Sequence, residues 1–113
     1  MAKAQGAAPF IVDSPTGGYQ YNESTMRRVY RISQMTDAAH KAGIELSYDT
    51  THQSVSFPDG ELIKHFDIIT PLVKADGVLN LCKLKTHTYM GMTGAVKNTF
   101  GAIPGRAKPG YHA

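Results

Sequence analysis

Two polar loops of this chain carry residue types that bind small anions. The longer loop spans residues 83–94 and continues into a short helix that we predict over residues 93–100. Lysine ammonium groups, a helix N-terminus capped by threonine and glycine backbone N–H groups suit phosphate, sulfate or carboxylate. The candidate ligand-binding residues are Lys85, Thr86, Thr93, Gly94, Lys97 and Asn98.

Two residues are candidates for acid–base chemistry. His87 lies in the longer loop, and an imidazole titrates near neutral pH. Asp13 opens the shorter loop, residues 13–18, where a carboxylate binds a hydroxyl group or a metal, or simply starts a turn. The glycine spacing fits neither a Walker loop nor the three-glycine dinucleotide fingerprint. An ordinary glycine-rich turn with solvated lysines therefore stays open as the alternative.

Metal chemistry has little support in the residue types. Cys82 is the one cysteine of the chain, so an internal disulfide and a cysteine-based cluster built from this chain alone are excluded. We expect Cys82 to be a small buried residue at the end of a strand. The histidines lack the close spacing of zinc ligands. We therefore assign no metal ligand.

The charge is distributed unevenly along the chain. Residues 1–80 hold 7 basic and 9 acidic residues, whereas residues 81–113 hold 5 basic residues and no acidic one. Such a basic third favours an anionic ligand or an acidic partner. Five cations in 33 residues are too sparse for a nucleic-acid reader. No apolar run approaches the ~18 residues of a membrane helix, and no leader is evident, so we expect a cytoplasmic protein without membrane partners.

These loops need secondary structure to position them. Apolar runs over residues 10–12 and 78–82 predict two buried parallel strands, whose carboxyl ends meet at one sheet edge. Between them the patterns predict a helix over 23–42, breakable near Ser33 and capped by Gly43, a strand over 44–48, a hairpin around Pro58-Asp59-Gly60 and a helix over 70–76. The expected fold is α/β: one domain with a mainly parallel sheet, flanking helices and a β-hairpin insertion, an incomplete Rossmann-like layer architecture.

The motifs of the last third resemble a known family, the domain of unknown function 362. The resemblance rests on Lys83-Leu84-Lys85-Thr86-His87, on residues 93–101 and on Ile103-Pro104-Gly105, and also on residues 10–15 and 111–113. Many bacterial and archaeal members carry a ferredoxin-like module with two 4Fe–4S clusters after this domain. The resemblance implies that the chain is a segment of a longer iron–sulfur redox protein, with no cofactor of its own. No reaction follows from it.

Two functions are compatible with these observations. The first is an α/β module that binds a small anionic ligand at the carboxyl edge of its sheet, beside an electron-transfer module of the parent protein. The second is an interaction scaffold whose basic last third docks an acidic partner, such as a ferredoxin-like domain of the same parent chain. The residues leave open whether the module is an enzyme.

Overall fold

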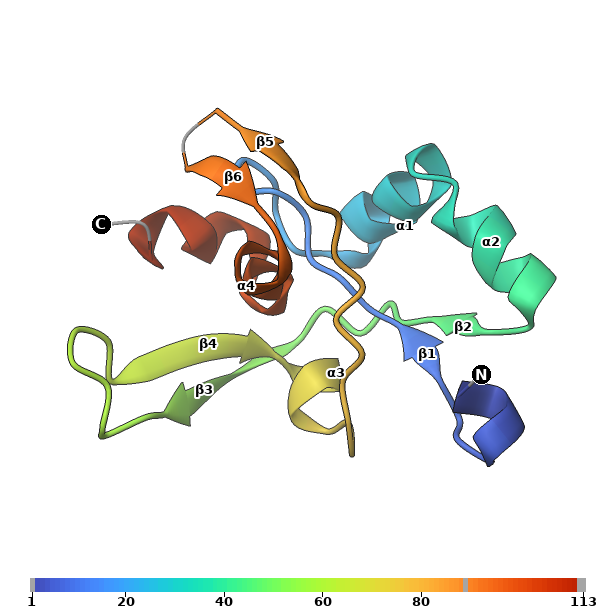
Figure 1. Cartoon of the computed structure of the whole chain (residues 1–113), viewed down its shortest axis with the longest axis horizontal. Coiled ribbons are helices and arrows are strands. Elements are labelled where there is room, and N and C mark those ends of the chain that lie inside the picture. Colours follow the sequence, from blue (N-terminus) through green and yellow to red (C-terminus); the bar gives the residue numbers. More distant parts are fainter. Residues whose placement is uncertain (1, 89, 112–113) are drawn as a thin grey trace.

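The computed structural model describes residues 2–88 and 90–111 (Figure 1). Residues 112–113, which close the family-like pattern, lie outside the described part. The helices are α1 (Glu23–Ile32), α2 (Met35–Ala42), α3 (Thr70–Val73) and α4 (Ala95–Asn98), with 3₁₀ helices over Ala2–Gln5, Thr99–Ala102 and Gly105–Tyr111. The strands are β1 (Phe10–Ile11), β2 (Glu45–Leu46), β3 (His52–Ser56), β4 (His65–Ile69), β5 (Lys85–His87) and β6 (Gly91–Thr93).

The strands form three separate pairs. β1 and β2 are parallel, with Phe10 opposite Glu45, whereas β3–β4 and β5–β6 are antiparallel. The expected mixture of helices and strands is confirmed. A mainly parallel sheet is not, because two of the three described pairs are antiparallel.

The prediction of a second buried strand at residues 78–82 is wrong. This segment is extended and pairs with no described strand. The exposed fraction is 77% for Leu79 and 88% for Leu81. The expected burial of Cys82 is also wrong, because this residue is exposed. An apolar run becomes a buried strand only where neighbours supply hydrogen bonds and cover both faces, and the described residues provide neither here. The two loops therefore do not meet through a shared sheet edge.

The long helix predicted over residues 23–42 forms as α1 and α2, with the expected break between them. The side chain of Asn22 accepts a hydrogen bond from the backbone N–H of Thr25 and caps α1. At the other end Gly43 adopts the left-handed conformation, with φ of 61°, and closes α2. Figure 1 shows both helices on one side of β1 and β2. Met26 and Tyr30 of α1 are buried there.

The predicted hairpin around Pro58-Asp59-Gly60 forms as β3 and β4, joined by residues 57–64. β4 leads directly into α3, which has Pro71 in its first turn and is shorter than predicted. Ile69, at the end of β4, and Ile103, near the C-terminus, are both buried. The C-terminal segment therefore folds back onto the rest of the molecule, and this return positions the candidate site.

Candidate functional site

The loop that follows β1 is held by a lysine from the far end of the chain. Lys108 Nζ lies 2.7 Å from Ser14 Oγ, 3.2 Å from Ser14 O and 2.6 Å from Pro15 O. Ser14 is buried, and its hydroxyl donates a hydrogen bond to the carbonyl oxygen of Ile103. An ammonium group has three protons, so the three contacts of Lys108 use all of its donors. Lys108 thus fixes the conformation of this loop.

Asp13 stands at the start of the same loop, beside Tyr30 of α1. The backbone N–H of Asp13 donates to Tyr30 Oη at 3.2 Å, and its carboxylate Oδ1 accepts the N–H of Ser14 at 2.7 Å. Burial raises the pKa of Asp13, against the opposing effects of the Ser14 hydrogen bond and the charge of Lys108. Burial also raises the pKa of Tyr30, to about 12. Asp13 therefore holds a proton at higher pH than an ordinary aspartate, as a general acid or base needs.

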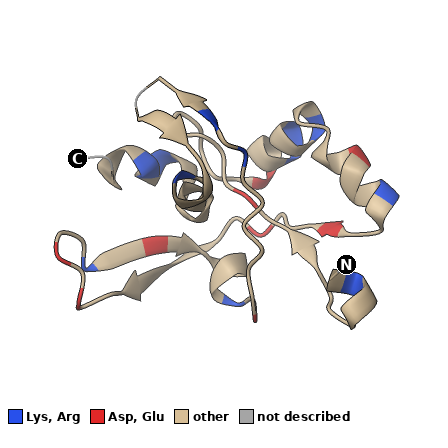
Figure 2. Cartoon of the chain, in the orientation of Figure 1, with Lys and Arg blue, Asp and Glu red and all other residues tan. Residues whose placement is uncertain are grey.

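Lys108 acts on this carboxylate, and Lys97 acts on Lys108. Burial lowers the pKa of Lys108 to about 8; the charge of Asp13 works in the opposite direction, and the charge of Lys97 lowers it further. The ammonium groups of Lys97 and Lys108 are thus close enough to repel each other. Figure 2 shows the lysines and arginines of the last third on the side of the molecule that carries β5, β6 and α4. We call Asp13, Ser14, Tyr30, Lys97 and Lys108 the β1-end site.

Two glycines allow the C-terminal segment to reach this site. A Cβ atom at Gly101 would lie 2.6 Å from Asp13 Oδ1, and one at Gly105 would lie 2.4 Å from the carbonyl oxygen of Tyr19. Both distances are far below van der Waals contact, so a side chain at Gly105 would clash with backbone, and one at Gly101 would displace the Asp13 carboxylate or the segment. Close backbone approach therefore brings together two parts of the chain that share no sheet.

The predicted ligand-binding residues on β5 and β6 lie on two faces of one hairpin. Lys85 is opposite Thr93, and His87 is opposite Gly91, so Lys85, His87 and Thr93 share a face. Thr86 is on the other face. His87 Nδ1 accepts the backbone N–H of Met90 at 3.1 Å, near the turn of the hairpin. His87 and Asp13 therefore belong to different elements.

The predicted residues around α4 have specific contacts. Thr93 does not cap this helix, because Gly94 occupies the N-cap position and no side chain bonds there. Lys97 Nζ lies 4.5 Å from the centre of the Phe100 ring. Asn98 Nδ2 donates to Asn80 Oδ1 at 2.7 Å, and Asn80 Nδ2 in turn donates to the carbonyl oxygen of Ala95 at 2.8 Å. Asn98 thus ties the extended segment 78–82 to α4.

The structure therefore groups the predicted residues unevenly. Asp13 and Lys97 both act on Lys108, whereas Lys85, Thr93, Gly94 and Asn98 lie on the adjoining β5, β6 and α4. Sequence reasoning missed Lys108 and Tyr30 as parts of the site. The sequence shows Lys108 as one cation of the acid-free last third and Tyr30 as one residue on the apolar face of a helix. Neither pattern predicts which distant residue the side chain contacts.

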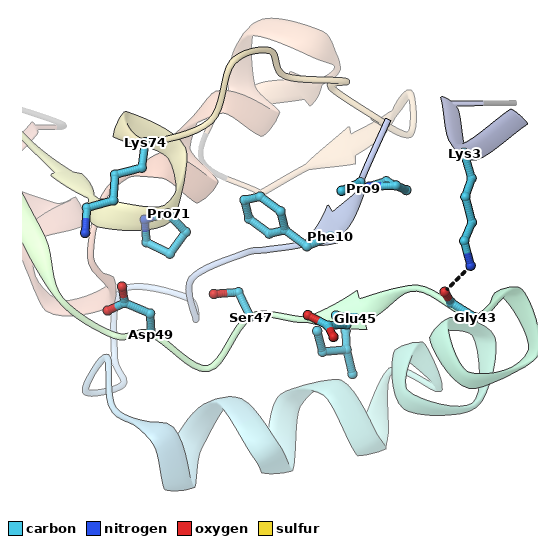
Figure 3. A pocket seen from close by; sticks show the side chains of 11 residues that line it. Lys3, Pro9, Phe10, Gly43, Glu45, Ser47, Asp49, Pro71 and Lys74 are labelled. Carbon is cyan, nitrogen blue, oxygen red and sulfur yellow. Dashed lines mark hydrogen bonds between the residues drawn. The ribbon is translucent and has the colours of Figure 1, made fainter. Parts of the chain in front are cut away.

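Two pockets are lined by residues other than those of the β1-end site. The larger, of about 520 Å³, opens over the face of β1 and β2, with Phe10, Pro71 and Lys74 along its wall (Figure 3). Lys3 closes one side, where its Nζ donates to the carbonyl oxygen of Gly43 at 2.8 Å. The smaller, of about 380 Å³, lies between β3–β4 and the C-terminal 3₁₀ helix.

Within residues 2–88 and 90–111, no three His, Cys, Asp or Glu side chains gather closely enough to hold a metal ion. In the same part of the chain, no helix has the length and apolar character needed to cross a membrane.

These features define a small α/β chain with a polar cluster where the loop after β1 meets the C-terminal segment. The model of the family described as "Domain of unknown function (DUF362)" matches residues 1–113, so the chain belongs to this family and the resemblance is confirmed. The chain is 30% identical over 112 residues to a thylakoid-associated protein of Synechocystis sp.. The match covers 99% of this chain and 32% of that protein, so the chain spans about a third of its relative. No solved structure matches the chain.

Proposed function

We propose that the chain binds a small oxyanion at the β1-end site. One observation carries this proposal: Lys108 lies beside the half-buried Asp13 carboxyl group and is repelled by Lys97, which pairs with no carboxylate among the described residues. An anion placed between the two cations relieves their repulsion. Phosphate, sulfate and carboxylate are the groups with suitable charge and acceptor oxygens.

The residues of the site have different parts in this proposal. Lys108 has already committed its donors to Ser14 and Pro15, so it holds the loop and supplies positive charge. Lys97 packs on the Phe100 ring, and no carboxylate pairs with it among the described residues, so Lys97 is the direct anion contact. Asp13 takes part as the polar partner of Lys108. Lys85, Thr93 and Gly94 extend the site from the neighbouring elements.

Titration with inorganic phosphate at low ionic strength tests this binding. We expect saturable NMR shifts at the amides of Ser14, Lys97 and Gly101. A charge-assisted contact contributes ~1.5–3 kcal/mol, so Lys97→Gln weakens binding by roughly ten- to a hundredfold. The matched control is Lys41→Gln on the exposed surface of α2, which leaves binding unchanged. Shifts scattered over the whole surface, or equal losses in both variants, would contradict an anion site.

We infer further that the parent protein is a redox protein in which this module lies beside 4Fe–4S clusters of a ferredoxin-like module. Family membership supports this inference, and so does the relative being about three times as long as the match. Iron and sulfide analysis of the full-length protein tests it, with the 113-residue chain as the cluster-free control. Cell fractionation of the full-length protein tests the proposed cytoplasmic location, since the Synechocystis relative is described as thylakoid-associated.

A second candidate function, docking of an acidic domain, has its own supporting observation. Leu81, Leu84 and Val96 expose 88%, 72% and 85% of their surfaces among the lysines of the last third. Apolar side chains amid charges mark protein-binding surfaces. If an acidic domain docks there, we expect slower amide hydrogen exchange at residues 79–84 in the full-length protein than in the 113-residue chain. Leu81→Ser in the full-length protein is expected to restore the faster exchange. Equal exchange in the two proteins would rule docking out.

A further inference from the structure

The smaller pocket is built from three distant parts of the chain. Gln20, Tyr21 and Asn22 come from the loop before α1, and Thr50, His52 and Asp67 come from the hairpin and the residues leading into it. Pro104, Arg106 and Ala107 come from the C-terminal segment, which Figure 1 shows above β4. Its volume of about 380 Å³ suits a small molecule rather than a macromolecule.

Hydrogen bonds fix the walls of this pocket. Tyr21 Oη donates to the carbonyl oxygen of Asp49 at 3.0 Å, and Asn22 Oδ1 accepts the N–H of Thr25 at 2.9 Å. On the opposite side, the backbone N–H of Asp67 donates to Tyr111 Oη at 3.0 Å. The ring of Tyr111 stacks on Phe66 at 5.6 Å. These contacts fix lining residues before a ligand binds, which lowers the cost of ordering the pocket.

Two opposite charges face this pocket without pairing. Arg106 and Asp67 both line it, yet the ion pair found among the described residues is Arg27 with Glu23, on α1. Neither the guanidinium of Arg106 nor the carboxylate of Asp67 has a side-chain hydrogen bond within the described part of the chain. An unpaired guanidinium binds a carboxylate bidentately, and an unpaired carboxylate binds an ammonium group.

The remaining described lining contains no further Lys, Arg, Asp or Glu, and His52 adds an imidazole. Gln20, Asn22 and Thr50 contribute amide and hydroxyl groups, whereas most of the lining surface is apolar, with Tyr21, Pro104 and Ala107 among its residues. Such a mixed lining has room for a short side chain. A purely anionic ligand would leave Asp67 repelled, and a purely cationic one would leave Arg106 repelled.

We propose that this pocket binds a zwitterion of the α-amino acid class, with its carboxylate on Arg106 and its ammonium group on Asp67. The site shares no residue with the β1-end site, although its Tyr21 lies near Asp13 and Tyr30. The volume of the pocket and the lack of a further Lys, Arg, Asp or Glu in its described lining favour small amino acids with neutral side chains over acidic, basic or large ones.

Titration of the ¹⁵N-labelled chain with glycine, L-serine and L-glutamine tests the proposal. We expect saturable shifts for at least one of them at the amides of Asn22, His52 and Ala107. N-acetyl-L-serine lacks the ammonium group and L-serinamide lacks the carboxylate. Each loses one charge-assisted contact, so each binds at least about tenfold more weakly than serine. Absence of saturable shifts with all three amino acids, or equal binding of either analogue, overturns the proposal.

Variants separate the two charges. Arg106→Gln and Asp67→Asn each weaken amino acid binding by about tenfold or more, whereas the matched exposed controls Arg28→Gln and Asp59→Asn do not. Retained dispersion of the amide spectrum shows that each variant is folded. Phosphate shifts at Lys97 persist in Asp67→Asn, so failure of this proposal is distinguishable from failure of the oxyanion site. Unchanged amino acid binding in either pocket variant overturns the assignment.

Discussion

Asp13 and Lys108 show how burial and charge oppose each other at single residues. Each is attracted by the charge of the other, yet burial dominates both: the pKa of Asp13 is raised and that of Lys108 is lowered to about 8. Both shifts favour the neutral forms. The site is thus poised to change its charge when a ligand alters its surroundings, which an exposed ion pair is not.

The Lys108 shift predicts how stability depends on pH. The ordinary pKa of this amine is 10.5, and in the folded chain it is about 8, so between these values the unfolded chain binds more protons. The contribution of Lys108 to the free energy of unfolding therefore rises as the pH increases from 8 toward 10.5. Lys108→Met removes this contribution. In urea unfolding at pH 7, 8, 9 and 10, the wild-type value minus the variant value increases with pH.

A matched substitution isolates the effect of burial. Lys41 is exposed on α2, so its charge stays in water when the chain folds. For Lys41→Met, the wild-type free energy of unfolding minus that of the variant is expected to stay constant from pH 7 to pH 10. A constant difference for Lys108→Met as well would mean that Lys108 is fully hydrated in the folded chain.

At the scale of elements, the site is assembled by the close approach of the C-terminal 3₁₀ helices to the loop after β1, and not by strand pairing. The 3₁₀ helices over Thr99–Ala102 and Gly105–Tyr111 bring Gly101 and Gly105 against the loop that follows β1. The β5–β6 hairpin and α4 precede this return and carry most of the predicted ligand-binding residues. The site therefore forms only while the C-terminal segment packs against the loop that follows β1.

Gly101→Ala tests this dependence. The added Cβ would lie 2.6 Å from Asp13 Oδ1, so the segment or the carboxylate must shift, at a cost of about 1–3 kcal/mol in the free energy of unfolding. Gly77→Ala is the matched control, because a Cβ at Gly77 meets nothing within 4 Å. Urea unfolding of both variants measures the difference. Equal stability of the two would show that the 99–109 segment does not pack on Asp13.

At the scale of the whole molecule, the chain leaves a large part of its apolar surface uncovered. Leu62, Leu79, Leu81 and Val96 are each more than three-quarters exposed, whereas the buried apolar core includes Met26, Tyr30, Ala39, Ile69 and Ile103. Exposed apolar side chains on an extended, unpaired segment favour association with other surfaces.

The double variant Leu79→Ser, Leu81→Ser tests this exposure. Both side chains are already in water, so the free energy of unfolding changes by less than about 1 kcal/mol, whereas self-association falls. Analytical ultracentrifugation and urea unfolding measure the two effects. Ile69→Ser is the contrast: Ile69 has 0% exposure, so burying a hydroxyl there costs several kcal/mol. A loss of stability in the double variant comparable to that of Ile69→Ser would show that residues 79 and 81 are packed.

Local patterns in the sequence were sufficient for the local elements of this protein. The apolar spacing of α1 and α2, the Gly43 cap and the Pro58-Asp59-Gly60 turn each depend on neighbours within a few residues, so the sequence alone predicted them. The concentration of cations in the last third was equally visible. The tertiary structure decided whether residues 78–82 found a strand partner and which loop met Lys108, 94 residues from Ser14. A local pattern states which face a residue prefers to bury, whereas pairing and long-range contacts depend on where distant segments are placed.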